Sequence, residues 1–194
     1  MNDHPTLPQR RSIRLPGYDY SGAGMYFLTL CTHNRVSLFG EIIGITTPRA
    51  GLEPRAGLEP APTGEPRMSL NAFGRVVEQT WLDLVHHIEG IRLHAFIIMP
   101  NHVHGVVEIN PGQNENSQPM GKQTPISEIV RQLKTFSSRK INTMRNSPGT
   151  PIWQRNYHEH VIRDEQSFRA ISEYINHNPT TWRSDKYFDM ISTN

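Results

Sequence analysis

The stretch IIMPNHVHGVVEI, from Ile97 to Ile109, decides the fold because it reads as the end of one strand, a tight turn and a second strand. Pro100 and Asn101 are a residue pair that favours a turn. Side chains alternate faces along a strand, so the two histidines after the turn point to the same side of the sheet. Roughly 7 Å of strand rise separates His102 from His104, so both imidazoles can converge on one divalent ion.

Two histidines do not complete a coordination sphere, so this motif also has a simpler interpretation. In that interpretation the imidazoles are partly buried and bonded to backbone or side-chain partners. A histidine that lacks such a partner is costly inside an apolar strand. The pair therefore indicates either a metal site or two satisfied core histidines, and the motif alone leaves both interpretations open.

N-terminal to this stretch, the patterns predict a strand, a helix and the strand that enters the turn. Residues 25–35 are apolar with β-branched and aromatic members, which is typical of a strand. Ser69 is expected to cap a helix whose apolar positions recur at intervals of three and four as far as Ile88. The strand over residues 91–99 then leads into the turn.

C-terminal to it, the patterns predict two further helices and a strand. Thr124 is expected to cap a helix with a buried stripe from Ile126 to Phe136. Residues 151–162 read as a strand, and Asp164 opens a last helix that Pro179 ends. This order predicts an α+β fold, with a ferredoxin-like β-α-β-β-α-β sheet and an extra C-terminal helix.

A proline-rich repeat interrupts the first half of the chain. The hexapeptide PRAGLE occurs at residues 48–53 and again at 54–59, and it degenerates into PAPTGE at 60–65. Prolines remove backbone donors, and the repeat has too few apolar residues to bury. We expect a single domain over residues 1–194 with a surface loop at about 46–67. A proline-rich docking segment is the alternative.

Composition is typical of a soluble globular protein. The 194 residues are 36% hydrophobic and 20% charged, which suits one domain. The single cysteine cannot form an internal disulfide, the N-terminus lacks the apolar segment of a signal peptide, and no apolar stretch is long enough to span a membrane. We therefore expect a cytoplasmic protein without membrane contact.

Basic residues are concentrated in two places, although the net charge is only +2. Residues 122–155 hold seven lysines and arginines against one acid, and the segment RRSIR contributes Arg10, Arg11 and Arg14. Such patches neutralise phosphates even where acids elsewhere cancel the total charge. A solvated helix face is an equally good explanation of the first cluster.

Tyr174 is a reactive residue that complements the histidines. It shares a helical stripe with Ile171 and Ile175, which must face the sheet. A tyrosine in this position is commonly a core residue with a bonded hydroxyl. Asn178 lies one turn along, where its amide oxygen would complete a metal site begun by the histidines, although Pro179 draws it out of the helix.

Three blocks of the sequence, in this order, resemble one family. They are RRSIRLPGYDYSGAGMYFLTLCTHNR, then MPNHVH, then WQRNYHEHVIRDE followed by YINHNP. They resemble the single-tyrosine HUH transposases of the insertion-sequence type, in the branch associated with repetitive extragenic palindromes (REP). The resemblance covers most of the chain apart from the proline repeat and the tail.

This resemblance implies a metal-dependent transposase and endonuclease that cleaves single-stranded DNA next to hairpins through a 5′-phosphotyrosine intermediate and rejoins strands. It implies Tyr174 as the nucleophile and His102, His104 and Asn178 as ligands of Mg²⁺ or Mn²⁺. A monomer or a homodimer is expected. The proline repeat departs from the family pattern and leaves a catalytically inactive, palindrome-binding protein as the alternative.

Contacts to DNA are expected from basic and aromatic residues. Tyr157 lies in a strand-like block and is interpreted as a base-stacking or core residue, not as the nucleophile. A metal-dependent phosphohydrolase that uses the histidines alone is a third hypothesis, which the missing third histidine disfavours. The residues expected to contact DNA are Arg10, Arg11, Arg14, Arg131, Lys134, Trp153, Arg155 and Tyr157.

Overall fold

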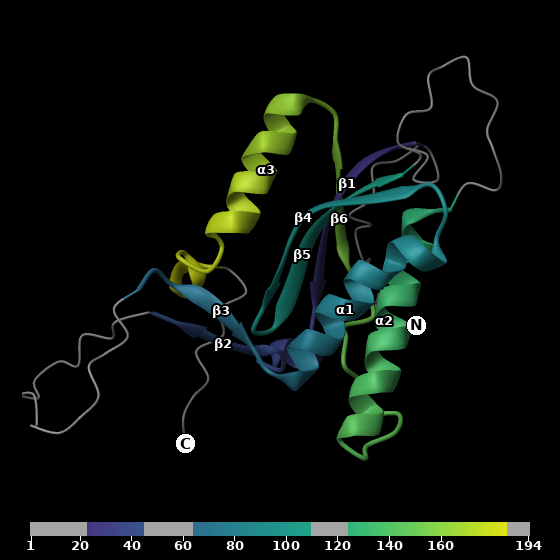
Figure 1. The fold of residues 1–194 in the computed structure, drawn as a ribbon, viewed down its shortest axis with the longest axis vertical. Helices are drawn as coiled ribbons and strands as arrows, with labels where there is room; N and C mark the ends of the chain where they lie inside the picture. The colour runs from purple at the N-terminus through teal and green to yellow at the C-terminus, as the bar shows by residue number, and fades with distance from the viewer. Residues whose placement is uncertain (1–22, 45–63, 110–123, 186–194) are drawn as a thin grey trace, which may run out of the picture.

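The centre of the molecule is a four-stranded sheet with the spatial order β4-β5-β1-β6, in which all neighbouring strands are antiparallel. The computed structural model describes residues 23–44, 64–109 and 124–185 (Figure 1). This strand order, with helices in both crossovers, is the ferredoxin-like arrangement, so the predicted α+β fold is confirmed. The strands are β1 (Gly24–Cys31), β4 (Ile91–Met99), β5 (His102–Ile109) and β6 (His158–Ile162).

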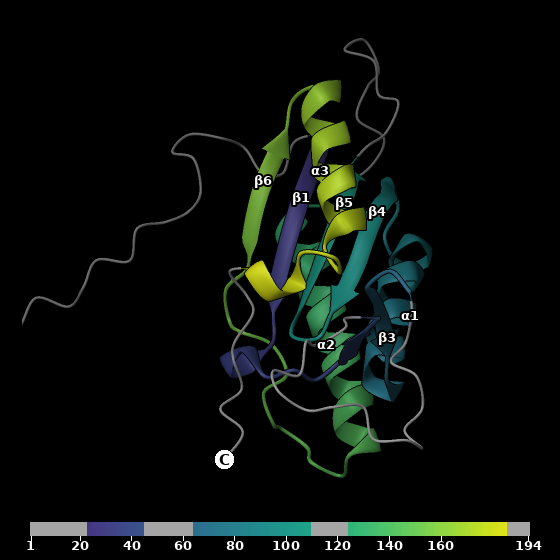
Figure 2. The same ribbon diagram turned by 90° about the vertical axis from the view of Figure 1, so that its left-hand side faces the viewer.

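Three helices cover the two faces of this sheet unequally. α1 (Ala72–His87) and α2 (Ile126–Met144) pack against each other on one face (Figure 1). α3 (Glu165–His177) lies alone across the other face, in contact with β4 and β5 (Figure 2). No helix within the described ranges is long and apolar enough to cross a membrane.

The main core lies between the sheet and the pair of helices α1 and α2. β5 is buried almost throughout on both faces, and its sequence combines small and apolar residues with His102 and His104. Gly105 of β5 faces α1, where a Cβ atom would overlap the indole ring of Trp81. The glycine after the two histidines is therefore required because Trp81 packs directly on the strand.

Asn71, and not Ser69, caps the first helix. The Asn71 side-chain oxygen accepts hydrogen bonds from the backbone N–H groups of Phe73 and Gly74, at 2.9 and 3.0 Å. Asparagine is among the best N-cap residues, so it sets the helix start two positions later than the prediction. Ser69 belongs to a strand instead.

A two-stranded sheet that the sequence patterns did not predict flanks the proline repeat. β2 (Gly40–Ile43) pairs with β3 (Arg67–Leu70). Ile43 is the register partner of Arg67, so the two ends of the connecting segment lie side by side. Residues 45–63, which include most of the expected loop, lie outside the described residues. The loop therefore stays a prediction, except that its expected end at Arg67 falls within β3.

The second helix also differs from the prediction at its start and along its buried stripe. α2 begins at Ile126 after Pro125, without a side-chain cap from Thr124. Phe136 was expected to be buried, but it is 41% exposed. The stripe continues from Leu133 to Ser137, four residues on, because this spacing stays closer to the face that meets the sheet.

Strands β1 and β6 are shorter than predicted. The strand expected over 25–35 ends at Cys31, because Asn34 and Arg35 adopt positive φ in a short 3-10 turn, η1 (His33–Arg35). The strand expected over 151–162 forms only from His158 onward. The residues before it approach β1 at one isolated bridge, between Thr32 and Trp153.

Candidate active site

His102 and His104 lie on the face of β5 that α3 covers, and both side chains are buried. Their register partners on β1 are Cys31 and Thr29. The two ring centroids are 4.5 Å apart, closer than the roughly 7 Å rise between alternate residues of a strand. The two imidazoles therefore lean toward each other.

The hydrogen bonds of His102 determine which of its nitrogen atoms carries the proton. His102 Nδ1 lies 2.9 Å from Asn101 Oδ1. The Asn101 amide is oriented by its own Nδ2, which donates to the Arg35 carbonyl at 3.1 Å. His102 Nδ1 must therefore donate a proton, and Nε2 keeps the lone pair with which neutral imidazole binds metal ions.

His104 lies between two hydroxyl groups. Its Nδ1 is 2.9 Å from Thr29 Oγ1, and its Nε2 is 3.2 Å from the Tyr174 hydroxyl. If Nδ1 donates to Thr29, then Nε2 accepts from Tyr174, and this is the tautomer in which Nε2 can bind a metal ion. The ring also stacks on Phe27, with centroids 5.2 Å apart.

α3 places Tyr174 next to His104. Asp164 caps this helix as predicted, since its Oδ1 accepts a hydrogen bond from the Ser167 N–H at 2.7 Å. Ile175 is fully buried in the apolar cluster beneath the helix, which fixes the rotation of the helix about its axis. Tyr174, one position earlier, is 40% exposed and so is accessible from solvent.

An open pocket of about 520 Å³ lies between the strands, α3 and the turn that follows α3. Thr29 is in register with His104 on one side and with His158 on the other, so these residues form a row across the sheet. Polar and aromatic side chains surround this row. The pocket is lined by Phe27, Thr29, His104, His158, Tyr174, Thr181, Ser184 and Asp185.

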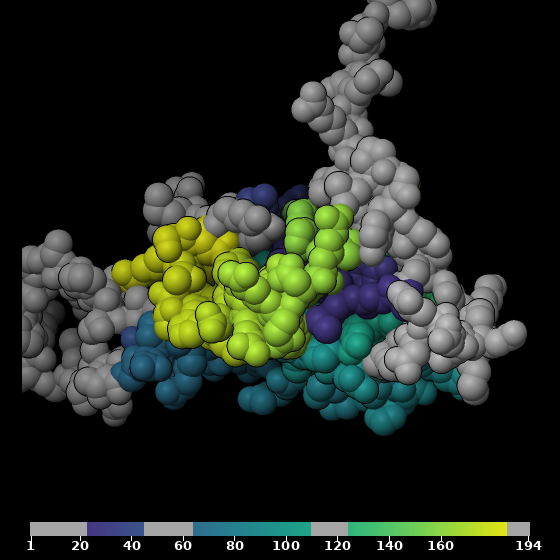
Figure 3. All heavy atoms as spheres, turned by 90° about the horizontal axis from the view of Figure 1, so that it is seen from above, coloured from purple at the N-terminus to yellow at the C-terminus, as the bar shows by residue number. Residues whose placement is uncertain are grey.

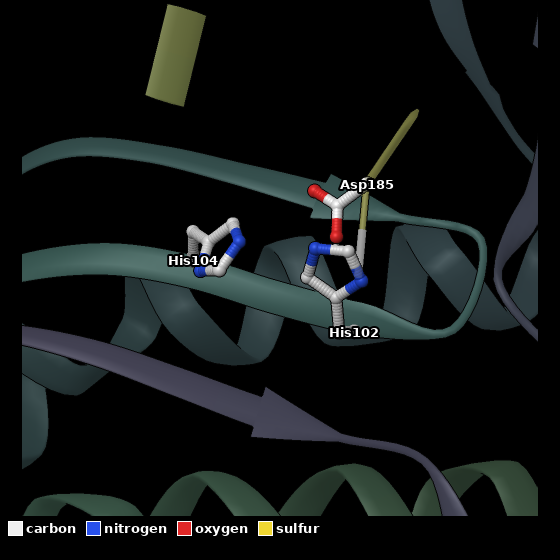
Figure 4. Close-up of side chains that lie close together, drawn as sticks. All are labelled: His102, His104 and Asp185. Carbon is white, nitrogen blue, oxygen red and sulfur yellow. The ribbon is translucent and has the colours of Figure 1, made fainter. Parts of the chain in front are cut away.

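Asp185 joins the histidines from the far end of the described chain (Figure 4). One ligand atom from each of His102, His104 and Asp185 lies within 4.8 Å of the other two. Figure 4 shows the carboxylate reaching from the segment after α3 toward the His102 ring. Two imidazoles and a carboxylate are a donor set that suits a divalent transition metal.

Asn178 lies directly behind this cluster. Its side chain is fully buried, and its Nδ2 donates to Asp185 Oδ2 at 3.3 Å. Its Oδ1 is buried and has no hydrogen-bond partner among the described residues. The predicted third ligand, Asn178, is therefore in contact with the cluster, whereas its role as a ligand stays a prediction.

Lys134 and Tyr157 lie with α2, on the side of the sheet opposite to the histidines. The Lys134 ammonium donates to the backbone carbonyls of Gln154, Arg155 and Asn156, at 2.8, 3.2 and 3.1 Å. Burial lowers the pKa of Lys134 to about 8. Tyr157 packs against the main core, with its ring centre 5.5 Å from the ammonium. The Lys134 ammonium therefore donates its hydrogen bonds to backbone carbonyls of its own chain. These bonds would have to break before Lys134 could make its predicted contact with DNA.

Trp153 is a core residue by its surroundings. It is 7% exposed, and its indole N–H donates to Ser137 Oγ at 3.0 Å. The structure thus buries the ring that was expected to stack on DNA bases, because Trp153 packs in the main core beside Phe39 and beside Ser137 of α2.

The predicted basic contacts fall into three groups. Arg131 is exposed on α2 and donates twice to Glu128, at 2.6 Å each, and these hydrogen bonds lower the pKa of Glu128 to about 2. Arg155 is exposed next to β6. Arg10, Arg11 and Arg14 lie outside the described residues, so their contacts stay predictions.

Sequence reasoning missed four residues of this site: Thr29, Asn101, His158 and Asp185. Thr29 and Asn101 orient the imidazoles, and their types carry no signal until the strand pairing is known. Strand alternation places His158 on the same face as Ile162, which was a usable signal for a third histidine near the pocket. Asp185 follows the last helix and belongs to no local motif.

Comparison with known families gives a match over the part of the chain that carries His102, His104, Tyr174 and Asn178. A family model described as "Transposase IS200 like" matches residues 75–178, from α1 to the residue after α3. A protein of Haemophilus influenzae described as an "Uncharacterized protein" is 37% identical over 196 residues, with 94% of each chain covered.

Two solved structures are similar to this chain. One is a REP-associated tyrosine transposase bound to a REP hairpin, with a TM-score of 0.49 and 16% identity, covering 84% of this chain and 71% of that one. The other is a candidate transposase of Deinococcus radiodurans, with a TM-score of 0.43 and 17% identity, covering 84% and 95%.

Proposed function

Because this chain belongs to the IS200-like transposase family, we propose that it is a metal-dependent nuclease and strand transferase that attacks single-stranded DNA with Tyr174. The observation that carries the proposal is the Tyr174 hydroxyl, which lies 3.2 Å from His104 Nε2 in an open pocket. A nucleophile next to a metal-binding imidazole, and open to solvent, is the arrangement that covalent phosphoryl transfer needs.

The donor set supports a divalent cation, Mg²⁺ or Mn²⁺, at this site. His102 and His104 would hold it through Nε2, and the buried Oδ1 of Asn178, which lacks a hydrogen-bond partner among the described residues, is a further oxygen donor beside them. When bound, the ion supplies Lewis-acid chemistry by polarising a non-bridging oxygen of the scissile phosphate.

The side chains of the pocket account for the covalent step. Tyr174 attacks phosphorus as its phenolate, so that a Tyr174 O–P bond forms while the bond from phosphorus to the 3′-oxygen breaks. The phenol releases its proton to solvent at the open mouth of the pocket, and the leaving 3′-oxygen takes one up. The product is a 5′-phosphotyrosine and a free 3′-hydroxyl, and attack by another 3′-hydroxyl reverses the step and rejoins strands.

The size of the pocket supports a substrate that places one nucleotide in it, and single-stranded DNA is the substrate that the family resemblance implies. Its volume of about 520 Å³ falls in the range of roughly 300–1,000 Å³ that holds a small-molecule-sized group. One nucleotide with its phosphate fits such a space. Cleavage next to a hairpin is the finer part of the proposal, and it rests on the resemblance of the sequence blocks to the REP-associated branch.

Trapping the covalent adduct tests this function. Wild-type protein should form an adduct with a single-stranded, hairpin-flanked oligonucleotide on a denaturing gel, and mass spectrometry of the digested adduct should place the link at Tyr174. Tyr174→Phe should abolish the adduct, because only the hydroxyl is lost, and the matched control Tyr157→Phe should keep it.

The other outcomes distinguish the rival functions. Hydrolysis without an adduct indicates a phosphohydrolase, and binding without cleavage indicates a hairpin-binding protein. A linked peptide that maps to Tyr157, or an undiminished adduct in Tyr174→Phe, contradicts the proposed mechanism.

A further inference from the structure

We infer that Asp185 is a direct ligand of the ion held by His102 and His104, and that Asn178 is the residue that positions Asp185. The inference rests on the proposed function, in which the histidines bind a metal. It adds a carboxylate to the two imidazoles and the Asn178 amide oxygen, because Asn178 contacts Asp185 through Nδ2 and keeps Oδ1 as a donor to the ion.

The distances within the cluster support direct coordination. Ligand atoms of His102, His104 and Asp185 lie within 4.8 Å of one another. Nitrogen and oxygen ligands lie about 2.0–2.2 Å from a bound first-row divalent ion, so two ligands on opposite sides of it are separated by roughly 4.0–4.4 Å. Small rotations of the side chains are enough to bring all three atoms onto one ion.

The turn that carries Asp185 is tied down at several points. It forms a short 3-10 helix, η2 (Trp182–Ser184), and the Asp185 N–H donates to the Trp182 carbonyl at 3.1 Å. Trp182 is 93% buried, and its ring centroid is 5.9 Å from that of His102. In the space-filling view of Figure 3, the yellow-green atoms of α3 and the yellow atoms of the turn form one continuous surface.

Asn178 positions Asp185 through a hydrogen bond from its side-chain amide nitrogen. Nδ2 donates to Asp185 Oδ2 at 3.3 Å, and the carboxylate faces the His102 ring (Figure 4). A hydrogen bond to a ligating carboxylate is the usual contribution of an outer-shell residue, because it orients the ligand. A carboxylate is also a stronger ligand for a hard or borderline divalent cation than a neutral amide oxygen.

The charge of the pocket is consistent with this assignment. Asp185 is the one acidic side chain among the described residues that line the pocket, and His104, His158 and Tyr174 lie around it. A single carboxylate among neutral donors reduces the charge of a divalent ion without cancelling it. The remaining positive charge is available to a phosphate group.

Binding of Mn²⁺ to the full chain, without DNA, tests the inference. Mn²⁺ accepts both imidazole and carboxylate ligands, and isothermal titration or the loss of its free-ion electron paramagnetic resonance signal measures its affinity. Asp185→Asn should weaken binding by at least about tenfold, and Asn178→Ala should weaken it by about tenfold, as is typical of outer-shell partners. Glu173→Gln, the same chemical change at an exposed position of α3, should leave the affinity unchanged.

Melting temperatures without metal verify that each variant is folded. Asp185→Asn that binds Mn²⁺ within twofold of wild type overturns the inference. If in that case Asn178→Ala still loses affinity, Asn178 is itself the ligand. His102→Ala distinguishes failure of the Asp185 assignment from failure of the proposed function. Unchanged Mn²⁺ binding in this variant means that the histidines do not bind the ion, which contradicts the proposed function.

Discussion

On β5, the side chains that point toward α1 and α2 differ in kind from those that point toward α3. Val103, Gly105 and Val107 meet the main core, and the glycine is required by the Trp81 ring. His102 and His104 alternate with them and carry the candidate site. All these side chains are buried, so the extent of burial does not distinguish the two faces. The residues that surround the side chains do distinguish the two faces. Substitutions on the face toward α1 and α2 are therefore expected to change stability, and substitutions on the face toward α3 are expected to change metal binding and cleavage.

The largest effect is expected on the α3 face. His104→Ala should lower cleavage of a single-stranded, hairpin-flanked oligonucleotide by about a thousandfold or more, because a bound ion supplies several kcal/mol of transition-state stabilisation. Hairpin binding should stay near wild type, since the predicted phosphate and base contacts come from other residues. A gel assay with Mn²⁺ measures cleavage, and a binding assay is the control. Wild-type cleavage in excess EDTA would contradict the role of a metal.

A stability effect is expected on the opposite face. Gly105→Ala should lower the free energy of unfolding by about 1–3 kcal/mol, because the new methyl group overlaps Trp81. Urea denaturation measures the loss, and cleavage per folded molecule should change little. Trp81→Phe removes part of the obstructing ring, so the double variant should lose less than the sum of the two single variants. Strict additivity would show that the indole ring is not the reason for the glycine.

A smaller effect on metal binding is expected from Thr29→Val, which keeps the shape of the side chain and removes the partner of His104 Nδ1. Affinity for Mn²⁺ should fall by about 10–100-fold, as is typical when an outer-shell partner is lost. The matched control is Thr80→Val, because the Thr80 hydroxyl donates to the Val76 carbonyl within α1, on the other face. Equal losses of Mn²⁺ affinity in Thr29→Val and Thr80→Val would show that the effect on metal binding is not confined to the α3 face.

The smallest effect is expected for a segment that belongs to neither face. Deleting Gly51 to Pro62 should leave the melting temperature and DNA binding near wild type, because loop length affects stability only logarithmically. The ends of the connection are held together by the pairing of Ile43 with Arg67. A fall of many degrees in a thermal melt would show that the proline repeat packs against the domain.

The parts of the fold that were predicted correctly are those with a local signal. The strands on either side of Pro100 and Asn101 form as expected, since the turn pair and the apolar runs stand next to each other in the chain. The last helix also has its cap at Asp164 and its end before Pro179. β2 and β3 were missed because each has only four residues and pairs with a partner on the far side of the repeat.

The site was predictable to the extent that its residues share an element. His102 and His104 share a strand and Tyr174 stands on a periodic helix, so their types and spacing predict a common site. The burial of Trp153 and the three backbone contacts of Lys134 depend on distant segments, and basic or aromatic character alone does not reveal them. Asp185 joins the histidines only through the turn after α3, which no sequence pattern predicted.

The position of Asp185 in the chain also matters while the protein is being made. The ribosome completes both histidines well before it reaches Tyr174 and Asp185. At synthesis rates of about 5–20 residues per second, the interval is on the order of 4–16 seconds. A nascent chain, or a fragment from an interrupted message, that ends before Tyr174 has neither the nucleophile nor the carboxylate. Under the proposed mechanism such products cannot nick the chromosome of the cell that makes them.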